Sequence, residues 1–236
     1  MKRVLVPVGK LLISVGMGVL LFVVWTLWGT GIGTNRAQNR LSEEFDAHGP
    51  FDASANDRGR PPQPPRNFAP DAGDPVFRIK IPAINLHDGK GFIVVEGVDQ
   101  EQLALGPGHY PECRPTLSVE LCTEQPEVWP GERGRMIVSG HRTTHSFPFL
   151  NLDRLDEGDD ILLQTWWGDF TYVVTKLRIV DDQTTEIVNP TATRRAQLVL
   201  TTCNPKHSSA ERLLVFAELS EWGPPAAGRK PATNGN

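Results

Sequence analysis

Three residues in separate parts of the 236-residue chain have side chains suited to acyl transfer, and each stands at the end of an apolar run. Cys203 follows the run 197–202, Arg212 opens the run 212–219, and His141 ends a third run. A thiolate can attack a carbonyl carbon, a guanidinium can stabilise the oxyanion that forms, and an imidazole can protonate the leaving amine. The sequence therefore predicts a catalytic site made of Cys203, His141 and Arg212.

Four ordered segments resemble the motifs of the sortases, over a stretch that runs from about Phe77 to Leu219. They are Ile81-Pro82-Ala83-Ile84, Gly106-Pro107-Gly108-His109-Tyr110-Pro111, Ser139-Gly140-His141-Arg142-Thr143-Thr144, and Thr201-Thr202-Cys203 with Arg212-Leu213. The His-Arg-Thr-Thr and Gly-His-Tyr-Pro pieces are most similar to class E, the housekeeping type of high-GC Gram-positive bacteria. The resemblance implies the family's catalytic roles for Cys203, His141 and Arg212.

The pattern of this stretch predicts an all-β domain. Alternating or β-branched runs are typical of half-buried strands, and they indicate seven or eight of them. The runs cover 77–81, 92–95, 136–138, 161–165, 170–180, 198–202 and 213–219, with short helices expected near 99–105 and 149–155. The pattern alone does not separate a sandwich from a barrel. The sortase resemblance implies a closed eight-stranded barrel with short helices in its loops.

The N-terminal part predicts a membrane anchor and a spacer. Residues 11–33 carry no charge and are long enough to cross a bilayer, and the basic residues of 1–10 favour a cytoplasmic N-terminus. A cleaved signal peptide is the alternative. Residues 34–75 are polar and then proline-rich, which favours an extended extracellular linker. The catalytic domain is predicted at 76–222, and 223–236 is expected to be a disordered tail.

The resemblance also implies the reaction. Cys203 would attack the threonine carbonyl of a C-terminal sorting signal, between Thr and Gly, and form a thioester. An amine of the cell-wall peptidoglycan would then release the cut protein. Class E sortases prefer a Leu-Ala-x-Thr-Gly signal, so we expect that form. Two alternatives stay open: a cysteine hydrolase that passes the acyl group to water, and a membrane-tethered binding domain without activity.

Four further residues are candidates for substrate binding. Thr202 directly precedes the nucleophile, His145 lies four residues after His141, and His109 and Tyr110 belong to the Gly-Pro-Gly-His-Tyr-Pro turn. Each also has a structural interpretation. A threonine in a strand is an ordinary β-former, a histidine in a loop is often solvated, and turn geometry explains most of the 106–111 segment.

An insertion interrupts the resemblance after Pro111. It runs to Pro130 and contains Cys113 and Cys122, which bracket a short loop. Because thiols outside the membrane are free to oxidise, we expect a Cys113 to Cys122 disulfide, with two reduced thiols as the alternative. The insertion could reshape access to the site, so it bears on the choice of sorting signal.

Composition limits the partners. The formal net charge is −4, which gives no basic footprint for nucleic acid. The acidic residues at 157–160 and 181–182 fit turns better than a calcium site, and neither a phosphate-binding loop nor a dinucleotide fingerprint is present. We therefore expect no metal and no cofactor. The expected partners are sorting-signal peptides, a peptidoglycan amine and the membrane.

Overall fold

The computed structural model describes residues 2–25, 29–50, 59–184 and 193–225. Its helices are α1 (Lys2–Val24), α2 (Thr30–Ala47) and α3 (Gln100–Leu105), with short 3₁₀ turns η2 (Pro82–Ile84) and η3 (Leu152–Arg154). Its strands are β1 (Pro75–Lys80), β2 (Phe92–Glu96), β3 (Gly108–His109), β4 (Gly134–Ser139), β5 (Asp160–Gln164), β6 (Asp169–Asp181), β7 (Ala196–Asn204) and β8 (Glu211–Gly223). All seven predicted strands are thus present, and β3 is an additional one.

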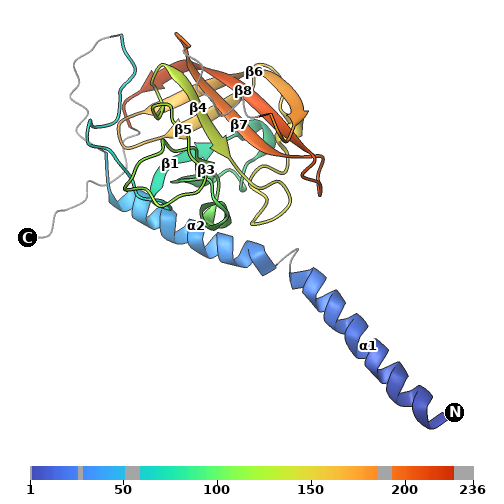
Figure 1. Ribbon diagram of the computed structural model, residues 1–236. Helices are drawn as coiled ribbons and strands as arrows, with labels where there is room; N and C mark the ends of the chain where they lie inside the picture. Colours follow the sequence, from blue (N-terminus) through green and yellow to red (C-terminus); the bar gives the residue numbers. More distant parts are fainter. Residues whose placement is uncertain (1, 26–28, 51–58, 185–192, 226–236) are drawn as a thin grey trace, which may run out of the picture.

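Within the described residues, the eight strands form a closed barrel in the order β1-β2-β3-β4-β7-β8-β6-β5. Most neighbours are antiparallel, but β2 pairs with β3, and β4 with β7, in parallel. Figure 1 shows β4, β7 and β8 side by side on the barrel wall. The closed all-β barrel predicted from the sortase resemblance is confirmed.

Alternation along the strands separates an inner from an outer face. On β7, Leu198 and Leu200 belong to the main core inside the barrel, whereas Val199 between them belongs to a second cluster on the outside. That outer cluster consists of Ile137, Val199, Leu214 and Phe216, with Tyr110 and Val180 packed against it. Successive side chains of a strand point to opposite faces, so odd-numbered positions of β7, including Cys203, share the outer face.

The N-terminal helix α1 is apolar and exposed. Residues Val6–Val24 have a mean hydropathy of 2.1, and none of this window is buried against the rest of the molecule. Figure 1 shows α1 projecting from the barrel. The predicted single apolar N-terminal helix is therefore present, although it ends at Val24 rather than near residue 33.

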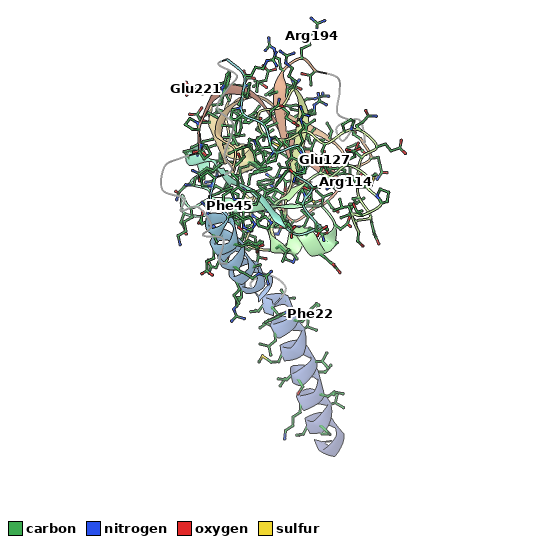
Figure 2. The ribbon with its side chains drawn as sticks, turned by 90° about the vertical axis from the view of Figure 1, so that its left-hand side faces the viewer. Phe22, Phe45, Arg114, Glu127, Arg194 and Glu221 are labelled. Atoms are coloured by element: carbon green, nitrogen blue, oxygen red, sulfur yellow. A yellow bond between two sulfur atoms is a disulfide. The ribbon has the colours of Figure 1, made fainter. Side chains whose placement is uncertain are left out.

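The expectation of an extended linker is wrong for residues 34–47, because they belong to helix α2, which packs on the barrel. Leu41 and Phe45 are buried in the main core, and Gln38 exchanges hydrogen bonds with the backbone of Ile93 at 2.7 and 3.0 Å. Figure 2 shows Phe45 where α2 meets the barrel. Two of the four buried positions at helical spacing, Thr34 and Gln38, are polar. The apolar period of this helix is therefore weak in the sequence.

The proline-rich segment also contacts the barrel. Phe68 packs edge to face against Trp129 and Trp167, with ring centroids 4.9 and 5.3 Å apart. Pro62 lies so close to Gly168 that a Cβ there would stand 2.5 Å from its ring. Residues 51–58 of the predicted linker and 226–236 of the predicted tail lie outside the described residues. The domain boundaries themselves stay a prediction.

The insertion carries the predicted disulfide. Cys113 and Cys122 are bonded, with Cα atoms 5.0 Å apart, and Cys203 remains free. Arg114 ties the inserted loop to the barrel, because its guanidinium lies 3.2 Å from Glu127 and 3.4 Å from the buried Glu96. Arg114 and Glu127 are labelled side by side in Figure 2. The loop is therefore fixed at both its disulfide and its charge network.

Candidate active site

Cys203 and Arg212 stand directly opposite each other on β7 and β8. Residues in such antiparallel register have Cβ atoms about 5 Å apart and project from the same face. That face is the outer one, because Arg212 shares its parity with Leu214 and Phe216 of the outer cluster. The structure thus places the thiol and the guanidinium as neighbours outside the barrel, at the end of the strand pair.

His141 reaches the same end of the barrel from β4. The parallel pair β4–β7 is in register up to Ser139 opposite Thr201. Beyond it, the Gly140 N–H donates to the Thr201 carbonyl at 3.1 Å, and the Thr202 hydroxyl donates to the Gly140 carbonyl at 2.7 Å. His141 follows Gly140 in the loop after β4, and Cys203 follows Thr202 on β7.

Gly140 allows the chain to turn at this point. A Cβ atom here would lie 2.7 Å from the ring of Phe149, a distance that packed atoms do not tolerate. Phe149 in turn donates its backbone N–H to the carbonyl of His141 at 3.1 Å. The loop after β4 is thereby folded back on His141.

Arg142 fixes the end of β7. It is 4% exposed, and its guanidinium donates to the Cys203 carbonyl at 3.1 Å and to Asn204 Oδ1 at 2.5 Å. An ion pair of 3.1 Å joins it to Asp153, which also pairs with Lys206 at 3.3 Å. The sequence prediction did not assign Arg142 a role. The available signal was its place directly after His141 in the motif.

The imidazole of His141 is neutral at neutral pH. Burial, followed by the neighbouring His145, lowers the pKa of His141 from its ordinary value of 6.5 to about 4. The two rings stack with centroids 4.5 Å apart and an angle of 22° between their planes. Within the described residues, the buried Nε2 of His141 has no hydrogen-bond partner. The described residues therefore leave the hydrogen-bonding capacity of this nitrogen unused.

Arg212 keeps donors available for a ligand. Its Nη1 donates to the carbonyls of Ser209 and Glu211 at 2.8 and 3.0 Å, in the β7–β8 turn. Both bonds use one nitrogen, so Nη2 and Nε can turn toward an oxygen bound beside Cys203. Arginine is suited to this task because its planar fork presents five N–H groups.

The predicted substrate contact does not fit Thr202 or His109. Thr202 is 3% exposed and faces inward, where its hydroxyl holds Gly140. His109 is 1% exposed; its Nδ1 lies 2.9 Å from Glu96 and its Nε2 lies 3.2 Å from the Val128 carbonyl. Burial would lower the pKa of His109, but the Glu96 carboxylate raises it above the ordinary value. Both side chains are structural.

The other two candidates lie near the outer face. Tyr110 packs against the outer cluster, where burial and then the charge of Asp99 raise its pKa. His145 is half-buried and contacts His141 directly. Their substrate-binding roles stay predictions.

The molecule is a closed β-barrel that carries the candidate residues Cys203 and Arg212 opposite each other on β7 and β8, with His141 in the loop after β4. The family profile described as "Sortase domain" matches residues 79–220, more than half of the chain. The chain therefore belongs to the sortase family, whose members are cysteine transpeptidases.

Several curated sortases are similar to this chain. Sortase SrtE1 of Streptomyces coelicolor is 25% identical over 232 residues, which cover 95% of this chain and 60% of that protein. Sortase D of Bacillus subtilis is 32% identical over 139 residues, which cover 59% of each protein. The chain thus spans about three fifths of the length of these two relatives.

Solved sortase structures are similar as well. The SrtF sortase from Corynebacterium diphtheriae matches with a TM-score of 0.57 and 25% identity, over 72% of this chain and 96% of that one. Sortase E from Streptomyces avermitilis matches with a TM-score of 0.52 and 29% identity, over 65% of this chain and 92% of that one. The named E-type relatives agree with the class E resemblance of the motifs.

Proposed function

We propose that this chain is a membrane-anchored cysteine transpeptidase that cleaves a C-terminal sorting signal and joins the cut protein to a cell-wall amine. The observation that carries this proposal is the pairing of Cys203 with Arg212 in the β7–β8 register. His141 follows two residues after the end of β4, which pairs with β7, and Gly140 between them is hydrogen-bonded to Thr201 and Thr202. Membership in the sortase family supports the same chemistry.

In the first step, the Cys203 thiol passes its proton to the neutral His141, and Sγ attacks the carbonyl carbon of threonine in the signal. A C–S bond forms, the Thr–Gly C–N bond breaks, and the departing glycine amine takes a proton from His141. Arg212 donates to the oxyanion of the tetrahedral intermediate. The product of this step is a thioester between the enzyme and the shortened protein.

In the second step, a peptidoglycan amine attacks the thioester. His141 accepts the proton of that amine, the new C–N bond forms, and the C–S bond breaks to restore the thiol. The lowered pKa of His141, about 4, suits the base of this step because the imidazole is neutral at pH 7. The overall reaction exchanges one amide for another and requires no external energy source.

Val199, Leu214 and Phe216 continue along the same face as Cys203 and Arg212, but they are buried and Tyr110 packs against them. We therefore assign only the scissile Thr-Gly bond of a Leu-Ala-x-Thr-Gly signal to this face, at the strand ends beside Cys203 and Arg212.

We also propose that α1 anchors the protein in the membrane with the barrel outside the cell. Its 19-residue apolar window spans roughly 28 Å at about 1.5 Å per residue, close to the thickness of a hydrocarbon core. Lys2 and Arg3 precede the window, which favours a cytoplasmic N-terminus. Protease accessibility of the barrel on intact cells tests this orientation.

The test of the reaction uses the full chain in detergent with paired peptides that end in Leu-Ala-x-Thr-Gly or Leu-Pro-x-Thr-Gly signals. With an added amine, mass spectrometry should detect the amide product from the alanine peptide and a thioester on Cys203. Cys203→Ala should form neither. Release of the free acid despite added amine would favour a hydrolase. If neither peptide is cleaved and no thioester forms on Cys203, a binding domain would be favoured. Cleavage of the proline peptide alone would refute the alanine preference.

A further inference from the structure

Helix α2 contacts the loop that follows His141. The Ser146 hydroxyl lies 2.9 Å from the Gly31 carbonyl and 2.7 Å from Asn35 Oδ1, so its one O–H is shared between two acceptors on α2. The backbones also approach closely, since a Cβ at Gly31 would lie 3.6 Å from the backbone nitrogen of Ser146. More than 110 residues of sequence separate the partners of these two bonds.

The turn that carries Ser146 has an unusual backbone. His145, Ser146 and Phe147 have φ angles of 52°, 62° and 55°, in the left-handed region that residues other than glycine rarely adopt. Such conformations persist only where the surrounding structure enforces them. The Phe147 N–H closes the turn on the Thr144 carbonyl at 3.0 Å, and the Ser146 contacts to α2 hold it from outside.

This turn places His145 on His141. The rings stack at 4.5 Å between centroids, and the contact covers one face of the His141 imidazole. Both rings are half-buried. Without the left-handed turn, the backbone at His145 would take a different direction and the stack would be lost.

We infer that helix α2 is a positioning element for His141 and acts through Ser146 and His145. The helix holds the turn, the turn holds His145, and His145 holds the His141 ring in one orientation while shielding one of its faces from water. This inference rests on the proposed function for its catalytic meaning. It assigns His145 a positioning role in place of the predicted contact with substrate.

The groups that surround His141 support this reading. His145 lies on the same loop and stacks on His141, Cys203 and Arg212 lie opposite each other on β7 and β8, and Arg142 is engaged with the end of β7. Burial and then His145 lower the pKa of His141. Loss of the stack would weaken both effects, so the titration of His141 reports directly on its positioning.

The experiment is a histidine-selective NMR titration of the full chain in detergent micelles, with the His141 signal identified by its loss in His141→Gln. Ser146→Ala removes the hydroxyl from the turn, and Asn35→Ala removes its acceptor on α2 without changing any residue of the turn. Ser42→Ala is the matched control, because its hydroxyl joins α2 to Arg78 instead, at 2.7 Å.

The expected result is a His141 midpoint that rises by about 1 pH unit, toward the ordinary value of about 6.5, in Ser146→Ala and in Asn35→Ala. In Ser42→Ala it should stay at the wild-type value. An unchanged midpoint in both test variants, or an equal shift in the control, would overturn the inference. If Ser146→Ala does not fold, Asn35→Ala alone decides.

Kinetics separate positioning from substrate contact. His145→Ala and Ser146→Ala should lower kcat by about tenfold with little change in KM, since a misplaced catalytic group slows chemistry. His145→Phe retains a ring for stacking and should recover most of kcat. A rise in KM alone would return His145 to substrate binding. The NMR readout remains informative even if the chain transfers no peptide, so failure of the proposed function and failure of this inference are distinguishable.

Discussion

Arg142 donates a hydrogen bond of 3.1 Å to the backbone carbonyl of Cys203. The residue that follows the candidate base is thereby attached to the candidate nucleophile through the main chain. Asp153 completes this arrangement with an ion pair of 3.1 Å to the same guanidinium. One buried side chain therefore joins the β4 loop to the end of β7, in addition to the bonds of Gly140 with Thr201 and Thr202.

We expect Arg142→Gln to lower both stability and activity. A glutamine cannot reach the three acceptors of Arg142, and breaking a buried, charged contact costs about 2–4 kcal/mol. Urea unfolding measures the free energy, and the peptide assay measures kcat. The control is Arg154→Gln, which removes an exposed arginine of η3 and should change neither. Equal stability of Arg142→Gln and wild type would contradict this account.

Arg212→Lys tests the guanidinium opposite Cys203. An ammonium keeps the charge but not the planar fork, so we expect kcat/KM to fall by about 100-fold or more, the scale of losing one oxyanion donor. Thermal unfolding should stay close to wild type because Arg212 is only half-buried. Arg195→Lys is the matched control, since its side chain is 74% exposed and lies just before β7, at the other end of that strand. Activity within a factor of about two of wild type in Arg212→Lys would remove this residue from the site.

The acid limb of the pH profile should lie far below neutrality. Burial and His145 lower the pKa of His141 to about 4, so the imidazole stays neutral down to about that pH. Below it, His141 carries a proton and cannot act as a base, so kcat/KM should fall near pH 4 rather than near 6.5.

Stability changes in the same window and must be measured alongside. Because the folded-state pKa of His141 is lowered, the unfolded chain binds the proton more readily between pH 6.5 and about 4. Stability from the neutral ring is therefore lost as the pH falls through that range. Circular dichroism at each pH separates unfolding from titration. An acid limb near pH 6.5 in folded protein would show that His141 is not shielded.

The disulfide should stabilise the fold without serving the chemistry. Cys113 and Cys122 are nine residues apart, and the loop-closure estimate for that length is about 2–3 kcal/mol. The double variant Cys113→Ser with Cys122→Ser should lose that much in urea unfolding and retain transpeptidation. Cys203→Ala should show the reverse pattern, with stability kept and product absent. A loss of activity in the double variant at full folding would give the insertion a catalytic role.

Phe45→Ala tests whether α2 is part of the folded domain. The Phe45 side chain is fully buried and stacks on Trp166 with centroids 4.9 Å apart. Truncation of a buried phenylalanine costs about 3–5 kcal/mol. Phe22→Ala on α1 is the control, because that side chain is 67% exposed. Both residues are labelled in Figure 2. Equal unfolding curves for the two variants would show that α2 does not contribute to the barrel's stability.

Motif order and strand periodicity predicted much of the fold and the central residues of the site. Alternation identified most of the strands because half-buried strands repeat every two residues. The two-residue strand β3 was not predicted, because Gly108 and His109 form too short a run to show the two-residue alternation of a strand. Helix α2 was not predicted because two residues of its buried face, Thr34 and Gln38, are polar and make hydrogen bonds instead of apolar contacts.

The sequence could not predict which side chains around the site are buried. His109 lies beside Tyr110 in the Gly-Pro-Gly-His-Tyr-Pro turn, but its ring is paired with Glu96, thirteen residues earlier in the chain. Arg142 reads as an ordinary loop charge until β7 provides a carbonyl for it. In both cases a partner distant in sequence decides the role, and a one-dimensional pattern carries no information about that partner.

The parallel pairing of β4 with β7 has a consequence for how the molecule acquires its reactivity. The bond from Thr202 to Gly140 joins residues 62 positions apart, and it lies directly behind the candidate nucleophile and base. Contacts between such distant positions are slow to form, because the chain loses entropy in closing a long loop before the contacts stabilise it. A partly folded molecule therefore exposes an isolated thiol with no acid, base or oxyanion donor beside it. The proposed transfer of peptides therefore depends on a contact that is expected to form late in folding.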